Sequence, residues 1–167
     1  MQLSHKKISI MTQSLTSEAY NRSSAKQEPY TILNTGSILH LNLKKYWFNM
    51  VAKEIKPEEY RDVKGYWVKR LLLDEKGNKM TKAAAHDLSE AIRYAFSDNW
   101  KNELLPKESI IPYDKIVFKN GYSKTAPTLA FKYEGIIIGR GKLEWGANED
   151  DFYFKLQLGE KLFDSTK

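Results

Sequence analysis

Residues 53–70 hold the densest set of side chains that can do chemistry, because cationic and acidic groups alternate there with aromatic rings. Lys56, Glu59 and Arg61 are the candidate site residues in this segment. An amine, a carboxylate and a guanidinium can together recognise a polar planar group such as a nucleobase, and a Lys–Glu pair can also transfer protons. The segment therefore favours base recognition, or a hydrolytic reaction with Lys56 as base or nucleophile and Glu59 as proton carrier.

The spacing of these residues predicts how a strand would arrange them. In a strand over 58–63, Glu59 and Arg61 point to one face and Tyr60 to the other, because side chains alternate with a period of two. If Glu59 and Arg61 face the interior, their burial requires that they pair. Lys56, in the loop before the strand, can reach the same place. Such a group lines a cleft, or it is a Glu–Arg ion pair that only closes the fold.

Positive charge is concentrated around this segment. Residues 37–73 contain eight Lys and Arg against four acidic residues, which is +4 of the net +6, whereas residues 125–167 carry six basic and seven acidic residues. Basic groups neutralise phosphates and aromatic rings stack on bases, so the pattern favours nucleic acid. The expected contact residues are Lys44, Lys45, Tyr66, Trp67, Lys69 and Arg70. The alternative is that the cations form a solvated face and the rings anchor the core.

The composition excludes several classes of chemistry. The 167 residues include no cysteine, which rules out disulfide scaffolds, Cys-ligated zinc, iron–sulfur clusters and thiol nucleophiles. The three histidines lack the spacing of metal ligands, and the glycines at 135–141 lack that of a phosphate-binding loop, so we predict no metal and no cofactor. No apolar run approaches the length of about 18 residues that spans a bilayer, and we predict no membrane contact.

Residues 1–34 differ in composition from the rest of the chain. They are rich in Ser, Thr, Gln, Asn and Lys, with apolar residues only in short groups, so they cannot bury enough surface to offset the entropy of ordering. We predict a flexible, disordered tail over 1–34 and one folded domain over 35–167. The apolar run at 8–11 is too short for a secretory signal, which favours a cytoplasmic protein.

Hydrophobic periodicity divides the first part of the folded region into alternating strands and helices. Ala-rich residues raise the helix propensity of the last of these elements. The predicted elements are a strand over 38–43, a helix over 44–53, a strand over 58–63, a turn at 74–78 and a helix over 81–96 capped by Thr81.

The C-terminal part reads as strands only. Strand-like runs occupy 116–118, 129–138 and 152–158, and Asn120-Gly121 is predicted to form a hairpin turn between the first two. Trp145 is predicted to pack beneath a loop. We therefore predict an α+β fold: a small, mostly antiparallel β-barrel of about five to six strands with two to three inserted helices.

Several short motifs occur in an order that resembles the ASCH domain, of the type found as stand-alone phage and prophage proteins. The resemblance covers residues 37 to 158. Its motifs are Ile38-Leu39-His40-Leu41-Asn42-Leu43-Lys44-Lys45, Trp47-Phe48-Asn49-Met50, Lys56-Pro57-Glu58-Glu59-Tyr60-Arg61, Tyr66-Trp67, Asn120-Gly121-Tyr122 and Glu144-Trp145-Gly146.

The signature of that family is Gly-x-Lys-x-x-Glu-x-Arg. It falls on Lys56, Glu59 and Arg61, with Glu54 in the glycine position. Because a residue other than glycine resists positive φ, we expect the turn before Lys56 to have a different shape here. Residues 74–105 resemble a helical insertion relative to a minimal ASCH domain.

The resemblance implies a PUA-like β-barrel with a cleft lined by the signature residues and a role in binding RNA or modified nucleosides. It also makes Asn120, Tyr122 and Lys124 candidate contact residues. The leading expectation is a binding protein for RNA or another single-stranded nucleic acid, in the cytoplasm of a bacterium or a phage-infected cell.

Two other functions stay open. Some ASCH relatives are RNA-directed hydrolases, and in an acetylcytidine amidohydrolase branch the essential lysine corresponds to Lys56, whereas Glu59 stands where that branch has an essential threonine. An acid at that position argues against deacetylation, and a ribonuclease is the other enzymatic option. The third function is binding to a host protein, with the N-terminal tail ordering on contact.

Overall fold

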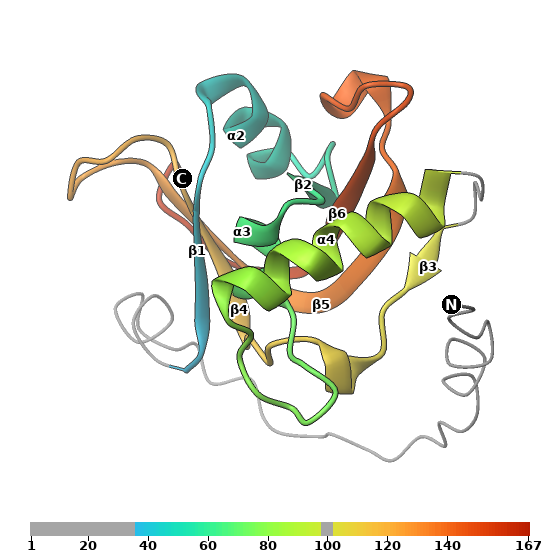
Figure 1. Ribbon diagram of the computed structural model, residues 1–167. Helices are drawn as coiled ribbons and strands as arrows, with labels where there is room; N and C mark the ends of the chain where they lie inside the picture. Colours follow the sequence, from blue (N-terminus) through green and yellow to red (C-terminus); the bar gives the residue numbers. More distant parts are fainter. Residues whose placement is uncertain (1–35, 98–101) are drawn as a thin grey trace, which may run out of the picture.

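The structure is a computed structural model that describes residues 36–97 and 102–167, so the predicted tail over 1–34 lies outside the described residues. The first half of the described chain alternates strands with helices (Figure 1). Its elements are β1 (Ile38–Asn42), α2 (Lys45–Ala52), β2 (Glu58–Asp62), α3 (Gly65–Leu71) and α4 (Lys82–Ser97).

The second half consists of strands with two short 3-10 turns between them. Its elements are β3 (Glu103–Leu104), η2 (Lys107–Ser109), β4 (Lys115–Lys119), β5 (Thr128–Arg140), η3 (Leu143–Trp145) and β6 (Phe152–Asp164). The three longer strands confirm the C-terminal runs predicted from alternation. The predicted Asn120-Gly121 turn is the start of a longer β4–β5 connection, in which Asn120 N–H bonds to Pro127 O at 2.9 Å.

The sheet is mixed and curled. Its strand order is β1-β4-β5-β6-β2, with β3 paired to β5, and β1–β4 is its parallel pair, while the other pairs are antiparallel. Figure 1 shows the long strands β5 and β6 bending around the helices. The predicted α+β class and mostly antiparallel sheet are confirmed. The sheet is a half-barrel, since no hydrogen-bonded pairing joins its edge strands β1 and β2 within the described residues.

Irregular pairing accounts for the bend in β5. The β5–β6 register shifts three times between Ala130 and Gly135, and Gly135 has φ 123°. Bulges of this kind bend a strand and increase its twist, and glycine takes positive φ without steric penalty. The curled sheet therefore encloses one main core on its inner face.

That core is built from alternate strand residues and from one stripe of each short helix, as the periods of two and 3.6 require. Helices α2 and α3 cover the inner face of the sheet. Helix α2 buries Phe48 and Val51, and helix α3 buries Val68 and Leu71. The fully or nearly fully buried strand residues in this cluster are Leu39, Leu41, Ile116, Phe118, Leu129, Phe131, Ile136, Ile138, Phe154 and Leu156.

Two elements lay beyond the sequence prediction. The sequence pattern of residues 66–73 predicts neither helix nor strand, and these residues contain most of α3. Strand β3 has two residues, too few for an alternating pattern. The predicted cap of α4 is confirmed, because Ala84 N–H donates to Thr81 Oγ1 at 3.2 Å. No helix among residues 36–97 and 102–167 is long and apolar enough to cross a membrane.

Candidate functional site

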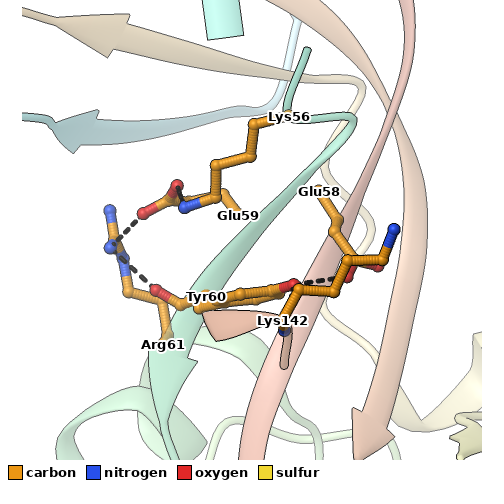
Figure 2. Close-up of polar contacts among 6 residues, drawn as sticks. All are labelled: Lys56, Glu58, Glu59, Tyr60, Arg61 and Lys142. Atoms are coloured by element: carbon orange, nitrogen blue, oxygen red, sulfur yellow. Dashed lines mark hydrogen bonds and ion pairs between the residues drawn. The ribbon is translucent and has the colours of Figure 1, made fainter. Parts of the chain in front are cut away.

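Lys56, Glu59 and Arg61 form one charged group, which we call the triad. The Nζ atom of Lys56 lies 2.9 Å from Glu59 Oε2, and Nη1 of Arg61 lies 2.6 Å from Glu59 Oε1 (Figure 2). The side chains of Lys56 and Glu59 are 3% and 4% exposed, whereas that of Arg61 is 15% exposed. The predicted meeting of these three residues is confirmed, and Arg61 is the member that reaches the surface.

The position of β2 in the sheet explains why the triad is buried. Glu59 and Arg61 pair across to Leu156 and Phe154 of β6, which both belong to the main core. Cross-strand partners share a face, so Glu59 and Arg61 face the interior and Tyr60 faces away, as the period of two predicts. A carboxylate is tolerated there because each of its oxygens receives a cation.

The turn before Lys56 corrects one prediction. We expected Glu54, in the position of the family's glycine, to avoid positive φ, but Glu54 has φ 59°. Its carboxylate lies 2.8 Å from Nζ of Lys161, which also donates to Ala52 O at 2.6 Å. Glu54 thus takes the left-handed backbone conformation although it is not a glycine, and an ion pair to β6 accompanies this conformation.

Two aromatic rings enclose the ammonium of Lys56. It lies 5.0 Å from the centre of the Trp47 ring and 4.7 Å from that of Tyr60. Both distances are within the range of cation–π attraction. Periodicity places Trp47 on the apolar stripe of α2 and Tyr60 on the opposite face of β2, and neither pattern predicts that the ring contacts Lys56.

The segment between β5 and β6 holds both rings in place. Lys142 N–H donates to Tyr60 Oη at 3.1 Å, and that hydroxyl donates to Glu58 Oε1 at 2.7 Å (Figure 2). A Cβ atom on Gly146, which has φ 87°, would lie 2.5 Å from Trp47 Cζ2. Burial, together with the neighbouring Glu58, raises the pKa of Tyr60, so its phenol stays neutral. Trp145 is buried beside Tyr60, which confirms its predicted packing.

A second aromatic group lies on α3 beside Arg61. The guanidinium carbons of Arg61 and Arg70 are 4.9 and 5.2 Å from the Trp67 ring. The Tyr66 ring meets the Trp67 ring edge-on at 4.9 Å and remains 63% exposed. Arg70 donates to Tyr66 Oη and to His40 O, both at 3.0 Å. The structure thus brings four of the predicted contact residues together, namely Arg61, Tyr66, Trp67 and Arg70.

Positive charge exceeds negative charge at this place. The triad has two cations on one carboxylate, and Arg70 bonds to neutral acceptors but forms no ion pair among the described residues. The pKa of His40 lies below its ordinary value, because of burial first and then the positive charges of Lys119 and Arg70. An anion is therefore favoured at this surface.

The remaining predicted contact residues lie on other elements or, like Lys69, on another side of α3, and they do not form one group. Lys44 and Lys45 are exposed at the start of α2. Asn120 lies next to them, because its Nδ2 donates to Leu43 O at 3.1 Å, and this bond fixes the β1–α2 connection. Tyr122 is 93% exposed and Lys124 is exposed in the same β4–β5 connection, while Lys69 is exposed on α3. No ion pair or hydrogen bond links these side chains to the triad within the described residues.

Open space lies elsewhere along β2. A cavity of about 910 Å³ opens beyond the end of β2, with side chains of both charges along its walls, and none of the triad residues lines it. The amine of Lys56 is enclosed by Glu59, Trp47 and Tyr60. A substrate would have to displace one of these groups to reach it, so the arrangement suits binding at the Arg61–Trp67 end more than chemistry at Lys56.

Comparisons with protein-family models, with curated proteins and with solved structures found no match to this chain. The ASCH resemblance stays a prediction, and the function has to be inferred from the geometry of the site.

Proposed function

We propose that this protein binds single-stranded nucleic acid, RNA in the first place, through the surface formed by Arg61, Tyr66, Trp67 and Arg70. The observation that carries the proposal is the position of two guanidinium groups on the Trp67 ring beside an exposed Tyr66 ring. Cations neutralise the phosphate backbone, and exposed rings stack on unpaired bases. Lys44, Lys45, Tyr122 and Lys124 supply further cations and an exposed ring for a longer strand.

Binding is favoured over catalysis by the burial of the Lys56–Glu59 pair. A base or nucleophile has to come within hydrogen-bond distance of its substrate. The amine of Lys56 is already within that distance of Glu59, and both side chains are buried. We therefore assign the pair a positioning role: Glu59 holds Arg61 against Trp67, and Lys56 holds Glu59.

The test is titration of a labelled single-stranded RNA of about 12 nucleotides, a length typical of such sites, at several salt concentrations. We expect affinity to fall with salt, and Tyr66→Ala to weaken binding by about 5- to 150-fold, the value of one base–ring stack. Tyr94→Ala is the matched control, because Tyr94 is 85% exposed on another helix, α4.

Each alternative function has its own result in this experiment. Mass spectrometry of the nucleosides recovered from the same samples detects an altered nucleoside or a cut strand, which would establish a hydrolase. Equal affinities of the wild type, Tyr66→Ala and Tyr94→Ala would refute the proposed surface. No binding of RNA or DNA at low salt would refute the proposal and favour a host-protein partner.

A further inference from the structure

The guanidinium groups of Arg61 and Arg70 lie at Trp67, where the carboxylate of Glu59 already pairs with both Lys56 and Arg61, and we propose that a phosphoryl group of the ligand occupies this place. The inference rests on the proposed function and specifies which part of the nucleic acid the site holds. The same chemistry is offered by a phosphodiester of a strand, by the phosphate of a mononucleotide and by inorganic phosphate.

Arg61 has donors that form no hydrogen bond within the described residues. Its two hydrogen bonds, to Glu59 Oε1 at 2.6 Å and to the Tyr60 carbonyl at 2.9 Å, both leave from Nη1 (Figure 2). Its Nε–H is buried and has no acceptor among the described residues. A ligand does not reach a buried atom in this conformation, so the donors that Arg61 offers to a phosphoryl group are those of Nη2, for which no hydrogen bond is formed within the described residues.

Glu59 has to balance more than one positive charge. Its second oxygen is taken by Lys56 at 2.9 Å, so one carboxylate serves two buried or half-buried cations. Arg70, on the same indole, is bound to the His40 carbonyl and the Tyr66 hydroxyl and adds a third positive charge. Two guanidinium groups on one ring repel each other, and an anion that contacts both would remove that repulsion.

A phosphoryl group suits this place better than other anions do. Guanidinium groups match phosphate oxygens in geometry, and a tetrahedral phosphate offers oxygens in several directions, so it can contact two arginines at once. The exposed Tyr66 ring lies beside these arginines and offers a stacking surface to a base. Phosphate and base are neighbouring parts of one nucleotide. The arginines, which can bind the phosphate, lie beside the Tyr66 ring, on which the base can stack.

The experiment is calorimetric titration of the full chain with uridine 5′-monophosphate, uridine, inorganic phosphate and the single-stranded RNA used above. We expect the monophosphate to bind about 10- to 100-fold more tightly than uridine, the effect of hydrogen bonds to a charged group. Arg70→Gln removes a surface cation and should abolish most of this preference, and Arg61→Lys should reduce it. Arg93→Gln, which loses an exposed guanidinium on α4, should keep it.

The outcomes separate this inference from the proposed function. RNA binding with equal affinities for the monophosphate and uridine would overturn the phosphoryl site and leave the RNA proposal standing. A preference for the monophosphate without RNA binding would support the site and overturn the RNA proposal. Binding of inorganic phosphate alone, lost in Arg70→Gln, would support the site with free phosphate as its ligand. If Arg61→Lys does not fold, Arg70→Gln decides: a preference retained in that variant refutes the inference.

Discussion

Glu59 and Arg61 stand two residues apart on β2 and lie 2.6 Å from each other on the inner face of the sheet, where the neighbouring strand presents Leu156 and Phe154. An ion pair thus fills a place that apolar side chains fill in the rest of the core. The pair is completed by Lys56 from the preceding loop. Because burying charge is unfavourable unless it is paired, the three residues depend on one another.

This dependence predicts a large loss of stability for Glu59→Gln. The substitution leaves the ammonium of Lys56 and the guanidinium of Arg61 buried or half-buried without a counter-charge, and we expect a loss of about 3–5 kcal/mol in the free energy of unfolding. Urea unfolding followed by circular dichroism measures it. Asp62→Asn is the control, because its ion pair with Lys64 is exposed on both sides and should contribute nothing measurable. Equal unfolding midpoints for the two variants would contradict the prediction.

Much of the fold follows from local patterns in the sequence. In β1 the buried residues Leu39 and Leu41 alternate with exposed ones, as a strand with one buried face requires. Thr81 caps α4 as predicted. Strand β2 was predicted although Glu58, Glu59, Arg61 and Asp62 have poor β propensity. It forms because the inward charges pair with each other and the outward Tyr60 packs in a second cluster with Trp145 and Tyr153.

The part of the site that escaped prediction comes from contacts between distant elements. Periodicity puts Trp47 on the buried stripe of α2 and Tyr60 on the outward face of β2, yet both rings contact Lys56. Helix α3 has seven residues, too few for its period to stand out, so the contact of Trp67 with both Arg61 and Arg70 was not predicted either. Residue types indicated the chemistry, and only the packing shows which groups meet.

Glu54 gives a test of the backbone conformation before Lys56. Its φ of 59° predicts that Glu54→Gly unfolds at a higher urea concentration than Glu54→Ala. Both variants lose the ion pair to Lys161, so the comparison isolates the backbone, and only glycine adopts the left-handed region without a steric penalty. At an ordinary position the order is reversed, because glycine gains more entropy on unfolding. Alanine being the more stable variant would show that this turn is not left-handed.

Gly146 tests the contact between the β5–β6 segment and the ring that covers Lys56. A Cβ atom there would lie 2.5 Å from Trp47 Cζ2, whereas nothing lies within 4 Å of a Cβ atom on Gly77. The two glycines have similar positive φ, 87° and 78°, so alanine strains both backbones alike. We expect Gly146→Ala to lose about 1–3 kcal/mol more than Gly77→Ala, the usual penalty of overpacking. Thermal unfolding of the two variants measures the difference, and similar losses would mean that Trp47 moves aside freely.

Tyr133 gives the last prediction, which concerns alkaline pH. Its hydroxyl is buried without a hydrogen-bond partner in the described part of the chain, and burial raises its pKa well above the ordinary value of about 10. In the unfolded chain this phenol ionises near pH 10, while in the folded protein it stays neutral, so the folded state retains a proton that the unfolded state loses. The stability contributed by the neutral phenol is thus full below about pH 10 and decreases as the pH rises above it.

Tyr133→Phe removes both the unpaired hydroxyl and this pH dependence. We expect the variant to be about 1–3 kcal/mol more stable than the wild type near pH 7, because a buried polar group without a partner is lost. We also expect a shallower decline of its unfolding free energy between about pH 9 and pH 11, the range around the ordinary tyrosine pKa. Tyr122→Phe, at a position that is 93% exposed, should match the wild type in both respects. Urea unfolding at a series of pH values compares the three proteins. A Tyr133→Phe variant that is less stable than the wild type would show that the hydroxyl has a partner, such as an internal water molecule. In that case the substitution would break a hydrogen bond and would not relieve an unpaired group.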